Sequence, residues 1–231
     1  MRTSKSDSLI ARRRPEPEIL DRLPPSDPAA IRSRRDLRHI DGFLGNTRWL
    51  IARIRSLVPP PEDVAELGAG SGDFLAALRR TLPSASLTGY DLHPSPRGDL
   101  HWIQGDLLET LRPHDVVTGS LIVHHFDDTA LRRLGEKLAP ARAILLVEPL
   151  RSVLSRFLSA CALPFAGAVT RHDMPASIRA GFRPGELAPL LGLTNHAISE
   201  WIVRRGALRF QAIRQDPVTN PAPTQISRAP Q

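Results

Sequence analysis

Three glycines, Gly68, Gly70 and Gly72, occupy alternate positions in the segment VAELGAGSGDF. An apolar run precedes them and a helical pattern follows. A strand that ends in a glycine loop and opens a helix leaves unobstructed backbone N–H groups facing one cavity, which suits a nucleotide ligand. Such a turn can also be only a tight connection. The neighbouring residues therefore decide between the two interpretations.

Spacing argues against two well-known nucleotide loops. A phosphate-binding P-loop ends in Gly-Lys-Ser or Gly-Lys-Thr, and no lysine lies near these glycines. The dinucleotide-binding fingerprint has its third glycine where Asp73 stands here. An acid, Glu66, precedes the loop instead. A carboxylate suits a ligand that carries an ammonium group better than one that carries a pyrophosphate.

Two further acids follow the next predicted strands. Asp91 comes about 20 residues after the glycines, where a carboxylate meets ribose hydroxyls in nucleotide sites. Asp106 ends the following strand, where a carboxylate can accept a hydrogen bond from an adenine amino group. Because parallel strands bind ligands at their carboxyl ends, Glu66, Asp91 and Asp106 together predict a ligand with an amine, a ribose and an adenine. Either aspartate alone could only cap or solvate a loop.

The middle of the chain alternates strand and helix patterns, which is typical of a parallel sheet covered on both faces. Strands are predicted over residues 63–67, 86–91, 100–106, 115–123 and 142–149, with helices over 73–82 and 127–138. The segments 196–203 and 207–213 alternate around a glycine turn and predict an antiparallel hairpin. The expected fold is α/β and Rossmann-like, with seven mostly parallel strands and a terminal antiparallel hairpin.

Helical segments flank this core. Asp27 suits the N-cap and Pro28 the first turn of a helix that reaches Leu44. A second helix is predicted to follow, to about residue 57. An amphipathic helix is predicted after Pro149, and a short helix over 184–191. We therefore expect a disordered tail over 1–15, a helical lid over 16–61, a core over 62–215 with a cap insertion at about 150–185, and a disordered tail over 216–231.

These motifs resemble the class I S-adenosylmethionine-dependent methyltransferases over roughly residues 18–213. The resemblance implies S-adenosylmethionine as the cofactor and S-adenosylhomocysteine as its product. It also implies that the glycine loop lies under the methionine and ribose, that Asp91 holds the ribose diol and that Asp106 touches the adenine. The cofactor-binding residues implied in this way are Glu66, Gly68, Ala69, Gly70, Gly72, Asp91, Leu92, Asp106, Leu107 and Ser120.

More narrowly, the segments LPPSDPAAIRSRRDLRHIDGFLGNTRW and LIVHHFDD look like a bacterial group of small-molecule methyltransferases, distantly similar to quinone and polyketide modifiers. The chain departs from the family pattern in one place. Only LHPSPRGDLH joins the second and third strands, so the helix usual there must be missing or a single turn.

The resemblance places HHFDD where the family faces the methyl group and the acceptor. His124 and His125 are therefore the catalytic candidates, and we expect His125 to face the substrate while His124 packs under the next helix. A histidine there could equally only pack or orient the backbone. Arg171 and His172, in a predicted loop, are candidates for gripping an anionic or phenolic acceptor, unless that loop is only solvated. Asn46 is a further candidate for acceptor binding, which could instead close a lid over the cofactor or only begin a helix that packs on the sheet. The other histidines lack a spaced partner set, so no metal site is predicted.

The formal charge of +7 invites a nucleic-acid partner. The arginines are scattered rather than clustered with aromatic residues, so we do not expect one. With a single cysteine, Cys161, no secretory pattern, and a longest apolar run interrupted by Pro164, the sequence predicts no disulfide and no membrane span, and a cytoplasmic protein. The sequence leaves the oligomeric state open.

The hypothesis that follows is methyl transfer from S-adenosylmethionine to a small organic acceptor. O-methylation of a phenolic, quinone-like or polyketide-like metabolite is the expected reaction. One alternative is an RNA or protein methyltransferase, although the sequence has no appended RNA-binding module and no Asn/Asp-Pro-Pro-Tyr/Phe run at the fourth strand. The other is a cofactor-binding protein without catalysis.

Overall fold

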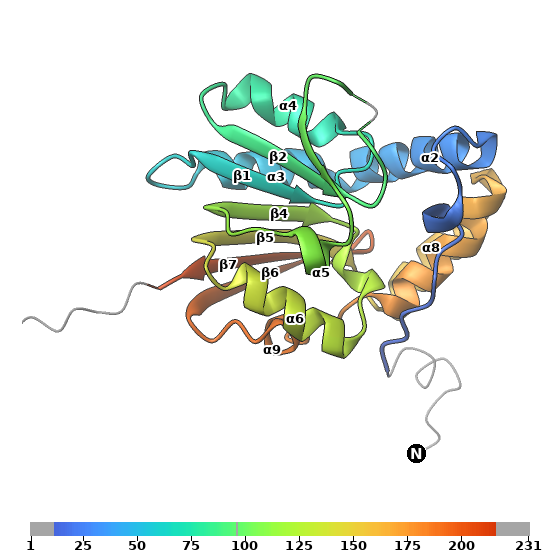
Figure 1. Ribbon diagram of the computed structural model, residues 1–231. Helices are drawn as coiled ribbons and strands as arrows, with labels where there is room; N and C mark the ends of the chain where they lie inside the picture. Colours follow the sequence, from blue (N-terminus) through green and yellow to red (C-terminus); the bar gives the residue numbers. More distant parts are fainter. Residues whose placement is uncertain (1–11, 96, 216–231) are drawn as a thin grey trace, which may run out of the picture.

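The computed structural model describes residues 12–95 and 97–215. Seven strands form one sheet in the order β3-β2-β1-β4-β5-β7-β6 (Figure 1). The strands are β1 (Asp63–Leu67), β2 (Ser86–Asp91), β3 (His101–Gln104), β4 (Val116–Ser120), β5 (Ala143–Pro149), β6 (His196–Val203) and β7 (Ala207–Arg214). The first five are parallel, whereas β7 runs antiparallel to both β5 and β6. The predicted fold class is confirmed.

Helices cover both faces of the sheet because alternate strand residues are apolar on both sides. Val64 packs toward α3 (Asn46–Arg55) and α4 (Asp73–Thr81). Its neighbour Ala65 packs toward the opposite layer. That layer contains α5 (Leu107–Thr110), α6 (Asp128–Leu138) and α9 (Leu187–Leu191). Every residue of β5 is buried, as expected for a strand between two helical layers.

A second group of helices lies beyond the carboxyl ends of the parallel strands (Figure 1). It consists of α2 (Pro28–Leu44), α7 (Val153–Ala162), η3 (Leu163–Phe165) and α8 (Ala168–Ala180). Gly45, at φ 69°, makes the turn from α2 into α3. Within the described residues, no helix is both long and apolar enough to cross a membrane.

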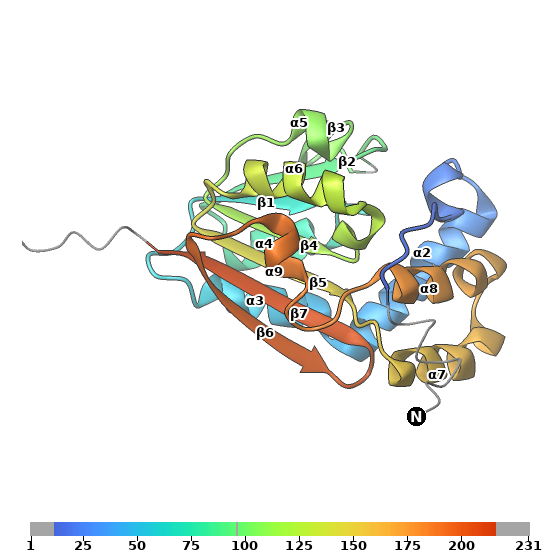
Figure 2. The ribbon, with the colours of Figure 1, turned by 90° about the horizontal axis from the view of Figure 1, so that it is seen from below.

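Residues 12–22, called the N-terminal strap below, run beside α8 and end in η1 (Leu20–Arg22) (Figure 2). The Arg14 N–H donates to the Arg179 carbonyl at 3.2 Å. The Arg13 guanidinium donates to the Phe126 carbonyl and lies 4.8 Å above the Phe182 ring. Residues 12–15 of the predicted N-terminal tail therefore contact the folded core, whereas 1–11 and the predicted tail 216–231 lie outside the described residues.

Two local expectations are wrong. The strand predicted over 115–123 ends at Ser120, because Leu121 adopts a left-handed conformation with φ 57° and the chain enters η2 (Val123–His125). The segment Arg171–Met174, predicted as a loop, lies inside α8. As predicted, no helix forms among the described residues between β2 and β3.

Candidate functional site

The glycine loop after β1 contains two kinds of glycine. All three glycines have positive φ, between 53° and 70°. A Cβ on Gly68 would lie 2.8 Å from the Ile122 side chain, and one on Gly72 would lie 2.5 Å from Leu100. A Cβ on Gly70 would have no atom of the described residues closer than 3.9 Å. Packing within the protein thus explains Gly68 and Gly72, while Gly70 leaves the backbone open to a ligand.

Glu66, in β1 beneath this loop, is a buried carboxylate with an unused oxygen. The residue is 7% exposed, and its Oε2 has no hydrogen-bond partner among the described residues. Burial, together with the nearby charges of Asp91, Asp73 and Asp41, raises the pKa of Glu66 well above its usual range. A positively charged ligand group would relieve both penalties. The site therefore fits the ammonium group of S-adenosylmethionine.

Asp91, at the end of β2, is tied to the glycine loop. Its Oδ2 accepts from the Gly70 N–H at 2.8 Å, and its Oδ1 accepts from the His93 N–H at 2.9 Å. Each oxygen keeps a second lone pair that can accept a hydroxyl. The next side chain, Leu92, is 58% exposed and offers an apolar surface beside the carboxylate. These features fit a ribose diol and an adenine face.

The positions of the other residues predicted to bind the cofactor point less directly to a ligand. Asp106 lies after β3 and caps α5, with its Oδ1 accepting from the Leu108 N–H at 2.8 Å. Asp106 therefore caps a helix, as one interpretation of the sequence predicted. Its Oδ2 has no partner among the described residues. The side chains of Ala69 and Leu107 are buried in the core, and the Ala69 N–H already donates to the Tyr90 carbonyl at 3.0 Å. Ser120 ends β4 and is half-buried.

The end of β4 is organised by Glu148, a fully buried residue of β5. Its Oε1 accepts from the N–H groups of Ile122 and Val123 at 3.0 and 2.9 Å. Its Oε2 lies 2.7 Å from His124 Nδ1 and also accepts from the His124 N–H at 3.2 Å. One carboxylate thus fixes both the turn after β4 and the orientation of the first imidazole.

His124 is 2% exposed and lies between two carboxylates. Its Nδ1 contacts Glu148, and its Nε2 lies 3.4 Å from Glu18 Oε1 in the strap. Burial lowers the pKa of His124, but the hydrogen bonds to Glu148 and Glu18 outweigh it and raise the pKa from 6.5 to about 9. His124 is buried, as expected, and its polar partners lie on β5 and the strap.

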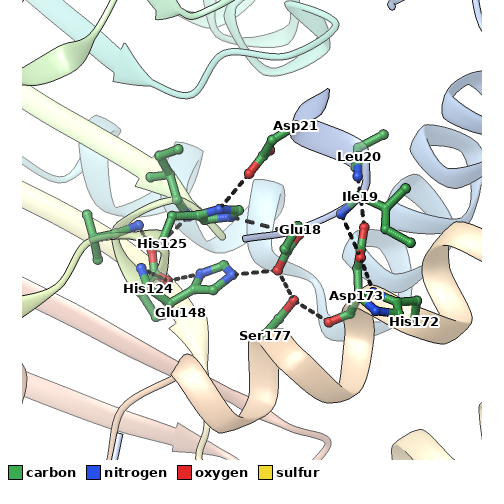
Figure 3. A network of polar contacts seen from close by, with 12 residues as sticks. Glu18, Ile19, Leu20, Asp21, His124, His125, Glu148, His172, Asp173 and Ser177 are labelled. Carbon is green, nitrogen blue, oxygen red and sulfur yellow. Dashed lines mark hydrogen bonds and ion pairs between the residues drawn. The ribbon is translucent and has the colours of Figure 1, made fainter. Parts of the chain in front are cut away.

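His125 is more accessible than His124, with 21% of its side chain exposed. Its Nδ1 lies 3.1 Å from Asp21 Oδ2, and its Nε2 lies 3.9 Å from Glu18 Oε2 (Figure 3). Sequence reasoning missed Glu18 and Asp21. They lie more than 100 residues before the histidines, in the proline-rich segment PEPEILD, and no local sequence pattern distinguishes them from acids that are exposed.

Asp173 connects the strap to α8. Its two carboxylate oxygens accept from the Ile19 and Leu20 N–H groups, each at 3.0 Å (Figure 3). The residues that were predicted to bind the acceptor do not form these hydrogen bonds to the strap. Arg171 is exposed, His172 is 58% exposed with its Nδ1 2.9 Å from Asp173, and Asn46 is fully buried with no partner for its amide among the described residues.

Comparisons with known proteins agree with this architecture. No family model matches the chain, and no curated protein matches it. Among solved structures, the plantazolicin methyltransferase BpumL, in complex with a monoazolic desmethylPZN analogue and S-adenosylhomocysteine (SAH), has a TM-score of 0.64 at 16% identity. The match covers 92% of this chain and 98% of BpumL. The plantazolicin methyltransferase BamL, in complex with a triazolic analogue and SAH, has a TM-score of 0.68 at 12% identity, over 91% and 97% of the two chains.

The chain has the class I methyltransferase fold. A third structure, the pyocyanin biosynthetic protein PhzM, has a TM-score of 0.54 at 20% identity, over 82% of this chain and 60% of PhzM. In this fold the glycine loop, Glu66 and Asp91 lie together at the carboxyl edge of β1 and β2, and the two histidines follow β4.

Proposed function

We propose that this protein transfers a methyl group from S-adenosylmethionine to a small organic acceptor. The observation that carries the proposal is the arrangement at one sheet edge of the buried Glu66, whose Oε2 has no partner among the described residues, the open Gly70 backbone and the twice-bonded Asp91. These three residues suit the amine, the ribose and the close approach of one ligand. The plantazolicin methyltransferases that share the fold were crystallised with SAH, which supports the same ligand here.

Each residue at this edge then has a defined task. S-adenosylmethionine supplies a methyl group activated by the adjacent sulfonium. Glu66 binds the ammonium group, Asp91 accepts the ribose hydroxyls and Leu92 packs on the adenine. Asp106 has one carboxylate oxygen left for the adenine amino group after capping α5. Gly68 and Gly72 hold the loop in the shape that exposes Gly70.

The acceptor side is formed by η2 and the strap. His125 is the more accessible of the two imidazoles, and we assign it the role of general base, which takes the proton from an acidic acceptor such as a phenol. The strap covers this end of the sheet and limits the entry of water, while alignment of the acceptor oxygen with the methyl group provides most of the remaining rate. O-methylation of a phenolic, quinone-like or polyketide-like metabolite is the reaction that this arrangement favours.

The charges around His125 favour a small acceptor over RNA. Around the histidine pair, the three carboxylates of Glu18, Asp21 and Glu148 outnumber the positive charges of Arg13 and of the protonated His124. A phosphate backbone close to these groups would be repelled. The basic character of the whole chain therefore does not extend to this part of the site.

Two measurements test the proposal in sequence. Titration calorimetry with SAH asks whether the site binds the product, with Gly70→Val as the matched negative control. Incubation with methyl-labelled S-adenosylmethionine and a panel of phenols, carboxylic acids, amines and structured RNA then asks which acceptor is labelled. Failure of SAH to bind the folded protein would refute the cofactor assignment. Binding without labelling of any small molecule would favour a non-catalytic cofactor-binding protein.

A further inference from the structure

His124 and His125 present the same ring nitrogen to the same carboxylate. His124 Nε2 lies 3.4 Å from Glu18 Oε1, and His125 Nε2 lies 3.9 Å from Glu18 Oε2. One atom from each of the three side chains lies within 4.8 Å of the others. Figure 3 shows Glu18 reaching from the strap toward both rings. Two imidazoles and one carboxylate therefore converge on a volume that one small ion can occupy.

The other ring nitrogen of each histidine is already held by a different acid. His124 Nδ1 lies 2.7 Å from Glu148 Oε2, and His125 Nδ1 lies 3.1 Å from Asp21 Oδ2. Histidines that bind metals nearly always donate their second N–H to a carboxylate, carbonyl or water, because this fixes the ring and makes the free nitrogen more basic. Both rings thus have the supporting hydrogen bond that a metal ligand requires, and both direct Nε2 toward Glu18.

Burial and charge also suit a cation. Glu18 and His124 are 8% and 2% exposed, and Ser177 Oγ donates a further hydrogen bond to Glu18 Oε1. Glu18, Asp21 and Glu148 bring three negative charges around the two rings, and Arg13 acts on Glu148 with one positive charge. A divalent cation bound here would displace the proton that His124 holds between Glu148 and Glu18 and would neutralise the remaining negative charge of the group.

We propose that Glu18, His124 and His125 form a binding site for a divalent transition-metal ion of the Zn²⁺ type. Two imidazole nitrogens and a carboxylate oxygen are a donor set that such ions accept, with ligand distances of about 2.0–2.2 Å. The observed separations of 3.4 and 3.9 Å between Glu18 and the two Nε2 atoms are close to those between ligands around one ion. Three protein ligands leave at least one coordination position open.

The site joins two distant parts of the chain. Glu18 belongs to the strap, whereas both histidines belong to η2 at the end of β4. Bound metal would therefore hold the strap closed over the acceptor end. With the ion bound, His125 Nε2 would be a ligand and could not take the proton of the acceptor; the open position would instead bind an oxygen of the acceptor and favour its ionised form. This role, unlike the binding itself, rests on the proposed methyl transfer.

Metal binding is tested on the full chain after treatment with EDTA. We expect one equivalent of Co²⁺ to give the visible absorption bands of a low-symmetry nitrogen and oxygen site, and one equivalent of Zn²⁺ to displace it. Glu18→Gln and His125→Gln should each weaken Zn²⁺ binding by about 100-fold or more. His114→Gln is the matched control, because His114 also pairs with a carboxylate, Asp63 at 2.7 Å, but belongs to no ligand cluster among the described residues.

Two further readouts separate a built site from adventitious binding. Asp21→Asn, which removes no ligand and weakens the hydrogen bond that supports His125, should weaken Zn²⁺ binding by about 10-fold. Zn²⁺ should slow tryptic cleavage after Arg22 in the wild-type chain and not in Glu18→Gln. The proposal fails if the wild-type chain binds no stoichiometric ion, or if Glu18→Gln and His125→Gln bind as tightly as His114→Gln. Because no cofactor or acceptor is present, these outcomes are independent of whether the protein transfers methyl groups.

Discussion

Asp91 Oδ2 accepts a hydrogen bond from the Gly70 N–H at 2.8 Å, which joins the end of β2 to the one glycine of the loop that faces open space. The acid proposed to hold the ribose therefore also sets the position of the backbone over which the cofactor lies. Loop shape and ribose recognition are coupled through this single contact. A change at Asp91 should accordingly affect binding more than the loss of the ribose contacts alone.

We expect Asp91→Ala to weaken SAH binding by tens-fold or more. Two charge-assisted hydrogen bonds to ribose hydroxyls, each worth about 1.5–3 kcal/mol, would be lost along with the contact to Gly70. Titration calorimetry measures the affinity. Asp99→Ala is the control, because Asp99 is an acid on the loop after β2 with a 62% exposed side chain. Unchanged affinity in a folded Asp91→Ala protein would contradict the cofactor assignment.

Alanine at Gly70 and at Gly72 should have different effects. At Gly70 the nearest atom that the new methyl group would meet in the described part of the chain is the Gly68 carbonyl oxygen at 3.9 Å, so the chain should fold with only the strain of a left-handed residue, about 1–2 kcal/mol. Its affinity for SAH should fall by about tenfold or more. At Gly72 the methyl group would lie 2.5 Å from Leu100, which adds an overpacking cost of about 1–3 kcal/mol.

Thermal unfolding and SAH titration of the two alanine variants provide the comparison. Gly72→Ala should be the less stable of the two proteins. Gly70→Ala should lose more SAH affinity than Gly72→Ala does, relative to the decrease in its free energy of unfolding. Equal SAH affinity in Gly70→Ala and wild type would mean that no ligand approaches this backbone closely.

Glu66→Gln should bind SAH more weakly and yet be more stable than wild type at neutral pH. The raised pKa of Glu66 means that the folded protein holds this proton more tightly than the unfolded chain does. The associated stability is fully present below about pH 4.5, and it is lost as pH rises through the pKa of the folded state. Glutamine removes this loss. It also removes the charge that binds ammonium, so affinity should fall by about 10- to 100-fold.

Urea unfolding of wild type and Glu66→Gln across pH 4 to 8 measures the effect. The difference in unfolding free energy between the two proteins should grow in favour of the variant as pH rises. SAH affinity of the wild type should increase over the same range, because the ionised carboxylate is the form that binds. A difference in stability that does not change with pH would show that the pKa of Glu66 is the same in the folded and unfolded states.

Asp173→Ala should release the strap from α8. The change leaves the Ile19 and Leu20 N–H groups without their acceptor, at a cost of about 1–3 kcal/mol. Tryptic cleavage after Arg22 should become several-fold faster while the core stays resistant. His172→Ala serves as the control, since it removes one contact to Asp173 and keeps both backbone hydrogen bonds. Equal cleavage rates in both variants would mean that other contacts hold the strap.

The sheet and its ligand edge could be predicted from the sequence because their signals are local. Apolar runs bounded by glycine or proline set the strands, and the distance from the glycine loop to Asp91 is fixed by one strand–helix–strand unit. The packing roles of Gly68 and Gly72 could not be predicted in the same way. They depend on Ile122 and Leu100, side chains far away in the sequence.

The acceptor end was harder to predict because it depends on contacts between distant segments. Glu148, on the neighbouring strand β5, accepts hydrogen bonds from three successive N–H groups after β4. These contacts end β4 early, although the apolar run in the sequence continues through Val123. Glu18 meets His124 across 106 residues. The segment around His172 has no strong helical pattern and contains Pro175, so its place in α8 follows from packing rather than from propensity.

His125→Ala and His124→Ala should separate catalysis from stability at the end of β4. His125 is partly exposed, so its removal should leave the fold and the SAH affinity nearly unchanged. Loss of a positioned proton acceptor should lower turnover by about 10²–10⁴, as measured with an acceptor found in the labelling screen. Assays with and without EDTA would separate the loss of the proton acceptor from the loss of a bound ion.

His124→Ala should mainly destabilise the protein, because it breaks a buried imidazole–carboxylate pair and leaves Glu148 and Glu18 without their shared partner. Breaking a buried pair of this kind costs about 3–5 kcal/mol, which chemical denaturation can measure. Glu148→Gln is the companion variant, since it keeps the shape of the side chain and weakens the same pair. If His125→Ala turns over as fast as wild type, alignment alone suffices and the acceptor loses its proton to water. If His124→Ala is as stable as wild type, the contacts of Glu148 with the backbone are enough to hold the turn.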